Sequence, residues 1–126
     1  MMERFLPILQ TIQTRLREIL TRNERYMLKW DVPNIRGIGE DLIDLAWDVS
    51  SQLIEVEHRI LYRSLKEAGL GIWNRASELR DRSLTEEDKE YFRSVQDALG
   101  NLCEKIETGE YYEALQKVAT KINYKG

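Results

Sequence analysis

Glu55 and His58 have the spacing in this 126-residue chain that most resembles a metal-binding motif. A Glu-x-x-His pair places two ligands on one helix face in carboxylate-bridged di-iron bundles. In those sites both ligands point into the bundle core. At about 100° per residue, Glu55 and His58 lie roughly 140–160° from the apolar face that includes Leu42, Leu53 and Ile60. We therefore expect His58, the single histidine, to be a surface residue, with a pH-responsive interface as an alternative.

The other reactive side chains also favour a protein without catalysis. Cys103 follows Leu102 in an apolar helical pattern, and no histidine is close to it in the sequence, so we expect a buried structural thiol. Asp41, Asp44 and Asp48 share one helix face, which we interpret as a solvated or partner-docking face, with Mg²⁺ binding through paired carboxylates as the alternative. We find no phosphate-binding loop, zinc pattern or serine elbow. We predict no catalytic residue, no metal ligand and no cofactor, and keep a metal-dependent enzyme as one alternative.

Basic residues at helical spacing suggest a second alternative, which is an accessory subunit that binds nucleic acid. Four of them follow one another at intervals of three, four or seven residues, and an aromatic side chain is next to the last; the candidate contacts are Arg15, Arg22, Arg25, Lys29 and Trp30. Arginine suits phosphate recognition because its planar fork binds two oxygens at once. The net charge of −3 is evidence against a basic footprint over the whole surface.

Long amphipathic runs predict an all-α protein, with one domain over residues 1–126. The expected helices span about 3–27, 36–67, 71–82, 86–107 and 110–122. Pro33 predicts a turn near residues 31–34, Gly69 and Gly71 predict a break, and Thr85 with Asp88 predicts a helix start. Short connections make an antiparallel bundle of four to five helices, in which the second is longest and central.

The expected second helix carries more apolar surface than one core contact needs. Beside its main face runs another stripe, which we take as the candidate partner interface; its residues are Ile43, Trp47, Ile54, Leu61 and Leu65. Tryptophan is enriched where protein interfaces are most strongly held. The leading hypothesis is therefore a non-enzymatic interaction or assembly protein that forms a homo-oligomer or binds a protein partner.

Two stretches resemble a known family. Residues 23–28 (Asn-Glu-Arg-Tyr-Met-Leu) and the run from Ser83-Leu84-Thr85 to Leu102 are similar to the four-helix-bundle family of 23S rRNA intervening-sequence proteins and retroelement accessory subunits. The resemblance covers about half the chain and implies an oligomeric bundle that works with a nucleic-acid enzyme. The chain departs from the family in its acidity, and in having Leu99-Gly100-Asn101-Leu102 where a Gly-Gly-Trp-like ending is usual.

The sequence also bears on the compartment. A single cysteine allows no internal disulfide, the N-terminal run is too short and too acidic for a signal peptide, and no stretch reaches the roughly 18 apolar residues of a membrane span. We expect a cytoplasmic protein that does not bind membranes. The segments also alternate in charge: residues 37–57 hold six acids and no base, whereas residues 58–82 hold six bases and three acids.

Overall fold

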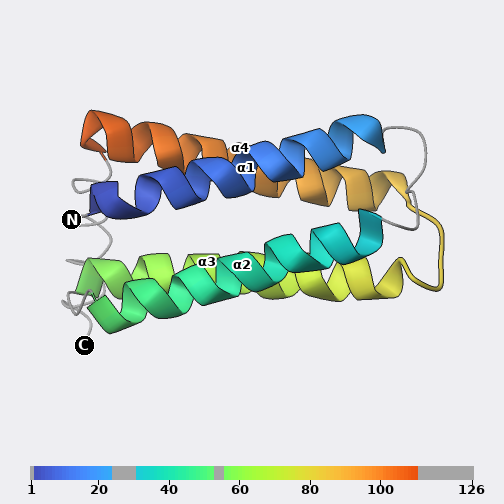
Figure 1. The fold of residues 1–126 in the computed structure, drawn as a ribbon, viewed down its shortest axis with the longest axis horizontal. Coiled ribbons are helices and arrows are strands. Elements are labelled where there is room, and N and C mark those ends of the chain that lie inside the picture. The colour runs from blue at the N-terminus through green and yellow to red at the C-terminus, as the bar shows by residue number, and fades with distance from the viewer. Residues whose placement is uncertain (1, 24–30, 53–55, 111–126) are drawn as a thin grey trace.

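The computed structural model describes residues 2–23, 31–52 and 56–110 and shows an antiparallel helical bundle. A short 3-10 helix, η1 (Met2–Phe5), leads into α1 (Leu6–Arg22), and then follow α2 (Val32–Gln52), α3 (Val56–Glu78) and α4 (Glu86–Thr108). Successive helices run in opposite directions, with α1 beside α4 in one layer and α2 beside α3 in the other (Figure 1). The predicted all-α bundle is confirmed. The predicted helix over 110–122 lies outside the described residues except for Glu110.

The prediction of one helix over 36–67 is wrong, because α2 and α3 are separate helices that run in opposite directions (Figure 1). The sequence between Gln52 and Val56 contains no proline or glycine, and the apolar period continues through it, so no local signal marks the end of one helix and the start of the next. At 21 residues α2 is among the longest helices, next to α3 and α4 at 23 each. It starts at Val32 rather than near residue 36, with Pro33 in its first turn, where a missing N–H costs little.

The predicted break at Gly69 and Gly71 is also wrong, because α3 runs through both residues. Gly69 lies against Gly39 of α2 so closely that a Cβ built on either glycine would come within 2.7 Å of the other's carbonyl oxygen. The two backbones are therefore in direct contact. Glycine is required here for close packing of two helices rather than for a turn.

The core lies between the two layers and draws side chains from all four α-helices. Its largest fully buried members are Phe92, Leu9, Ile12, Leu16, Ile35, Ile38, Leu42, Ile72, Ile106 and Val49. The tightest pairing is that of α2 with α3, whereas α1 packs mainly on α4. The bundle is thus two antiparallel helix pairs, and the contact of α1 with α2 is less extensive.

A buried aspartate organises the turn between α3 and α4. The Thr85 hydroxyl accepts a hydrogen bond from the Asp88 backbone N–H at 3.1 Å, and the Asp88 carboxylate accepts one from the Thr85 N–H at 2.9 Å, which forms a capping box. The predicted helix start is therefore confirmed. α4 ends at Gly109, whose φ of 81° is the left-handed conformation that glycine adopts without strain.

Candidate interaction surfaces

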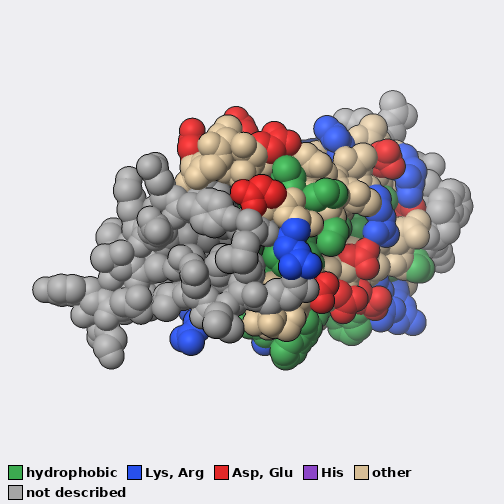
Figure 2. Space-filling model, turned by 60° about the vertical axis from the view of Figure 1, so that its left-hand side comes forward, with side chains coloured by type: hydrophobic (Ala, Val, Ile, Leu, Met, Phe, Trp, Pro, Cys, Tyr) green, Lys and Arg blue, Asp and Glu red, His purple; other side chains and the backbone are tan. Residues whose placement is uncertain are grey.

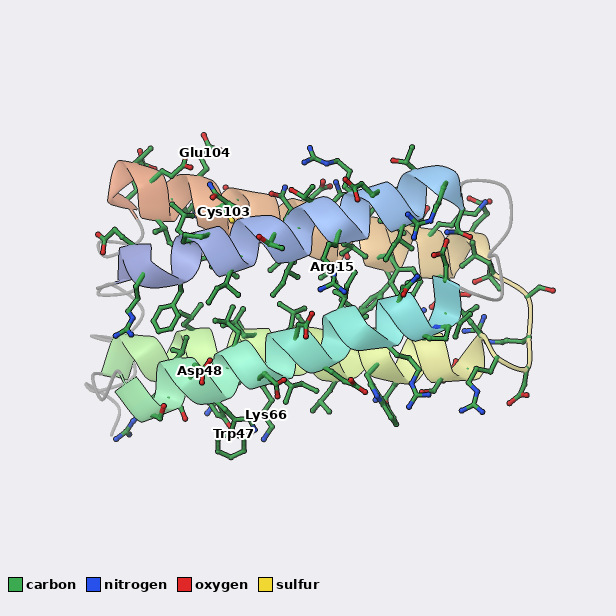
Figure 3. All side chains as sticks on the ribbon, in the orientation of Figure 1. Arg15, Trp47, Asp48, Lys66, Cys103 and Glu104 are labelled. Atoms are coloured by element: carbon green, nitrogen blue, oxygen red, sulfur yellow. The ribbon has the colours of Figure 1, made fainter. Side chains whose placement is uncertain are left out.

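The most exposed large apolar side chain of the described residues is Trp47, on the outer side of α2. It is 58% exposed, and its ring meets the edge of the Tyr62 ring of α3 with centroids 5.9 Å apart. The ammonium group of Lys66 lies over the Tyr62 ring, 5.7 Å from its centre, which is a cation–π contact. Trp47 projects away from the layer of α1 and α4 (Figure 3).

Together with Trp47, three side chains form what we call the α2·α3 seam: Ile43, Tyr62 and Leu70. Ile43 is half-buried against Gly69, and Leu70, at 42% exposed, lies two turns beyond Tyr62 on the same side of α3. The seam is therefore a strip of apolar and aromatic groups along the line where the two helices meet.

Charged ridges of opposite sign border the seam. The ridge on α2 is acidic and exposed, with Glu40, Asp44 and Asp48. The ridge on α3 is basic and exposed, with Arg59, Arg63 and Lys66, although Glu67 follows them. On the face drawn in Figure 2, acidic and basic side chains are likewise interspersed, with apolar groups between them.

The structure corrects the predicted partner interface. Leu61 and Leu65 are 3% and 2% exposed and belong to the core, so the expectation that they line an outer surface is wrong. The reason is that α3 runs antiparallel to α2 (Figure 1), so the second half of the stripe faces in a different direction from the first. Ile54 lies outside the described residues, and Ile43 and Trp47 remain at the surface.

The predicted nucleic-acid stripe is partly used inside the chain. Arg15 donates to Asp41 of α2 at 2.6 Å, and Arg22 binds Asp31 through two nitrogens at 2.6 and 2.8 Å. The Arg22 guanidinium, helped by the amides of Asn23 and Asn34, holds the pKa of the Asp31 carboxyl well below its usual range despite complete burial. Both arginines are thus neutralised by acids of the chain.

The remaining members of that stripe, Arg25, Lys29 and Trp30, lie outside the described residues. A stripe of free cations along α1 therefore has no support from the residues that the structure does describe.

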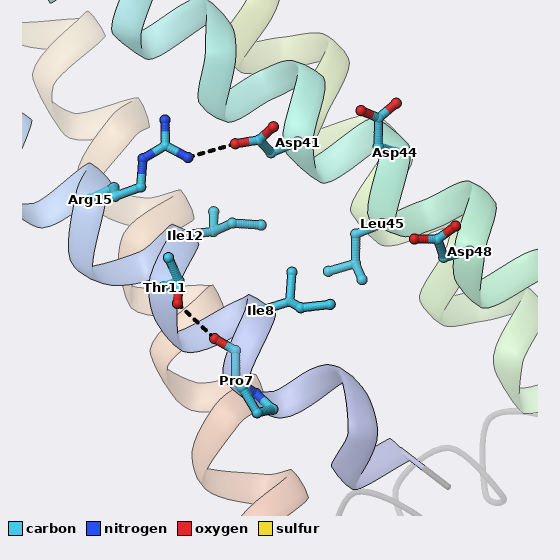
Figure 4. Close-up of a pocket in the computed structure, with 9 residues that line it drawn as sticks. All are labelled: Pro7, Ile8, Thr11, Ile12, Arg15, Asp41, Asp44, Leu45 and Asp48. Carbon is cyan, nitrogen blue, oxygen red and sulfur yellow. Dashed lines mark hydrogen bonds and ion pairs between the residues drawn. The ribbon is translucent and has the colours of Figure 1, made fainter.

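A groove runs between α1 and α2, with a volume of about 390 Å³. Apolar side chains of both helices line it, three aspartates stand along its α2 side, and Arg15 stands near one end (Figure 4). Its lining residues are Pro7, Ile8, Thr11, Ile12, Arg15, Asp41, Asp44, Leu45 and Asp48. Ile8 is 45% exposed, so much of its apolar side chain is open to solvent in this groove. The sequence reasoning missed Ile8, although its place beside Leu9 in an amphipathic helix marks it as an outward-facing apolar residue.

The candidates for chemistry gain little from the geometry. In the described part of the chain, no three His, Cys, Asp or Glu side chains are grouped so that they could hold a metal ion. Asp41 is already paired with Arg15, and the side chain of His58 lies outside the description. Cys103 is buried, and burial, with a smaller contribution from Glu107, raises the pKa of its thiol, which disfavours the reactive thiolate.

Among the described residues, no helix is long and apolar enough to cross a membrane. The resemblance to rRNA intervening-sequence proteins stays a prediction, since most of residues 23–28 lie outside the described part. Comparisons of the chain with protein-family models, curated proteins and solved structures found no match.

Proposed function

We propose that this chain is a non-enzymatic interaction bundle that self-associates through the α2·α3 seam. The observation that carries the proposal is the exposure of Trp47 between two ridges of opposite charge. A tryptophan buries roughly 150–250 Å² when it is fully covered, so leaving it in water forgoes a large hydrophobic contribution. A second copy of the chain is the occupant that the charges favour.

The charge pattern is self-complementary under two-fold symmetry. A two-fold axis that runs along the helices sets α2 of one copy opposite α3 of the other. Asp44 then faces Lys66 of the other copy within about one helical turn, and both pairs form at once because the interface is isologous. The same operation brings Trp47 and Tyr62 of both copies to the centre, where aromatic anchors contribute most to binding.

The face has about the size that a weak, specific dimer requires. α2 is 21 residues long, which is about 31 Å at 1.5 Å per residue, and two adjacent helices are roughly 20 Å wide. Each copy then buries about 600 Å², or about 1,200 Å² in total, at the lower end for specific interfaces. We therefore expect a dissociation constant in the micromolar range, which corresponds to a binding free energy of about −8 kcal/mol.

Sedimentation velocity over a concentration series tests the proposal. We expect the wild type to shift from monomer to dimer, and Trp47→Glu to weaken the dimer by at least about 30-fold, because losing one anchor costs about 2 kcal/mol or more. Ile8→Glu is the matched control, since it places the same charge at another exposed apolar position, on α1. It should leave the dimer unchanged.

A charge swap tests the symmetry. Lys66→Glu alone should weaken the dimer, and combining it with Asp44→Lys should restore it, because the exchanged pair still meets across the two-fold axis. A wild type that stays monomeric at high concentration would refute self-association. A dimer insensitive to Trp47→Glu would show that another surface is used.

Nucleic-acid binding through α1 is less well supported, because Arg15 and Arg22 are each bound to an aspartate of the chain. Phosphate contacts by these residues would have to break those pairs first.

A further inference from the structure

The groove between α1 and α2 combines an apolar floor with an acidic wall. Ile8, Ile12 and Leu45 line its apolar part, and Asp44 and Asp48 stand beside it on α2 (Figure 4). The floor is open to solvent at Ile8, which is 45% exposed, whereas Ile12 and Leu45 are buried. The groove is therefore wide enough to leave one large aliphatic side chain uncovered.

The charges along the groove are unevenly satisfied. At one end Arg15 binds Asp41 at 2.6 Å. Toward the other end, no hydrogen bond or ion pair to the side-chain carboxylate of Asp44 or Asp48 is found within residues 2–23, 31–52 and 56–110. With three carboxylates and one guanidinium, the lining carries a net charge of −2. A ligand that fits must be apolar on one side and cationic at its edge.

We propose that this groove binds an amphipathic helix of a partner protein, with an apolar stripe flanked by lysine or arginine. Grooves of this type take the apolar face of a helix, whose anchors repeat every three and four residues. Asp44 and Asp48 are four residues apart, so they lie about one turn apart on the exposed side of α2. Two basic residues at positions i and i+4 of the partner helix match that spacing.

The groove is distinct from the α2·α3 seam. Trp47 projects outward from α2 on the side away from α1, whereas Asp48 is part of the groove lining. A dimer formed through the seam leaves the floor of the groove uncovered. Asp44 takes part in both proposals, because it lines the groove and also faces Lys66 of the other copy in the dimer. The variants Ile8→Lys and Asp48→Lys, which change neither Trp47 nor the Asp44–Lys66 pair, therefore test the groove separately from the dimer.

Fluorescence anisotropy with defined peptides tests the inference on the full chain. The probe is a labelled synthetic helix of Lys, Leu and Ala, in which Leu repeats at three and four positions and Lys flanks the stripe. A scrambled peptide of the same composition and a version with Glu in place of Lys serve as comparisons. We expect saturable binding of the amphipathic cationic peptide, with at least about tenfold weaker binding of the other two.

Three variants locate the binding. Ile8→Lys removes the exposed floor residue and Asp48→Lys reverses one acidic position, and each should weaken binding at least about tenfold. Glu104→Lys is the control, because it makes the same change of charge at an exposed site on α4. It should change the affinity by less than about twofold.

Amide NMR of the wild type gives a measurement that needs no variant. Peptide addition should shift the signals of Ile8, Ile12 and Leu45. Equal binding of the scrambled peptide, unchanged binding in Ile8→Lys and Asp48→Lys, or shifts confined to another face would each overturn the inference.

Discussion

Replacing Asp88 with alanine should destabilise the bundle more than any change of an exposed acid. The side chain of Asp88 is 1% exposed and sits where the turn from α3 enters α4. Arg82 donates to its two oxygens at 2.6 and 2.9 Å, Arg75 donates at 3.1 Å, and the Thr85 N–H donates at 2.9 Å. One carboxylate thus holds the last part of α3, the turn and the first turn of α4 together.

The size of the effect follows from what each partner loses. Hydrogen bonds to a charged group contribute about 1.5–3 kcal/mol each, and breaking a fully buried ion pair costs about 3–5 kcal/mol. Arg82 and Arg75 are 36% and 28% exposed, so water can replace part of the lost interaction. We therefore expect Asp88→Ala to cost about 3 kcal/mol, which lowers Tm by roughly 10 °C in a domain of this size.

Urea unfolding followed by circular dichroism measures the difference. Asp97→Ala is the control, because Asp97 is exposed on the same helix and should change stability by less than about 0.5 kcal/mol. The Arg82 guanidinium and the Thr85 N–H hold the pKa of the Asp88 carboxyl well below its usual range. Its contribution is thus complete above the unfolded-state pKa, near 4, and is lost as the pH falls below that value.

The comparison of wild type with Asp88→Asn should show that pH dependence. Their difference in unfolding free energy should be constant near neutral pH and shrink in acid. A cost for Asp88→Ala no larger than that of Asp97→Ala, or a difference that grows in acid, would refute the assignment of Asp88 as the organising group.

Two further predictions concern the packing. Gly39→Ala should destabilise the bundle by about 2 kcal/mol in urea unfolding, because the new Cβ would meet the Gly69 carbonyl oxygen at 2.7 Å. Gly37→Ala on the same helix is the control and should stabilise the bundle by up to about 1 kcal/mol, because its nearest neighbour is Arg15 at 4.0 Å. Changes of the same sign in both variants would contradict the close contact of Gly39 with Gly69. Cys103 should react with a disulfide reagent at least about tenfold more slowly in the folded protein than in urea, because burial raises the pKa of its thiol, and equal rates would mean that the site is open.

Local signals were read correctly where the structure is built locally. The capping box of Thr85 and Asp88 depends on residues three apart, so the sequence shows it directly. The cations that complete the site come from α3 and from the turn. Arg75 is thirteen residues away, and only the antiparallel course of α3 and α4 brings it to Asp88.

Non-local packing explains the errors. Leu61 and Leu65 are buried because α3 runs antiparallel to α2 and packs against the other helices, and no property of the residues near Gln52 predicts this packing. Gly69 has the residue type of a helix end but serves the contact with Gly39 instead. The predicted partner interface is wrong in part for the same reason. Its residues lie on two helices instead of one, so Leu61 and Leu65 of α3 belong to the core, whereas Ile43 and Trp47 of α2 belong to the seam.

Some of the charged residues that alternate along the chain form ion pairs within the bundle, and others in the described part of the chain remain unpaired at its surface. Arg15 with Asp41 and Arg22 with Asp31 join α1 to the beginning and middle of α2, while Asp88 draws on the cations of α3. The pair of Arg15 with Asp41 is exposed and contributes only about 0–1 kcal/mol, so folding does not require the whole excess of acid on α2. The carboxylates that remain, at Glu40, Asp44 and Asp48, flank two apolar groups that the fold leaves uncovered, Trp47 on one side and Ile8 on the other. Unpaired charges beside exposed apolar side chains are typical of a docking surface, because the apolar groups supply affinity and the charges select the orientation and the partner.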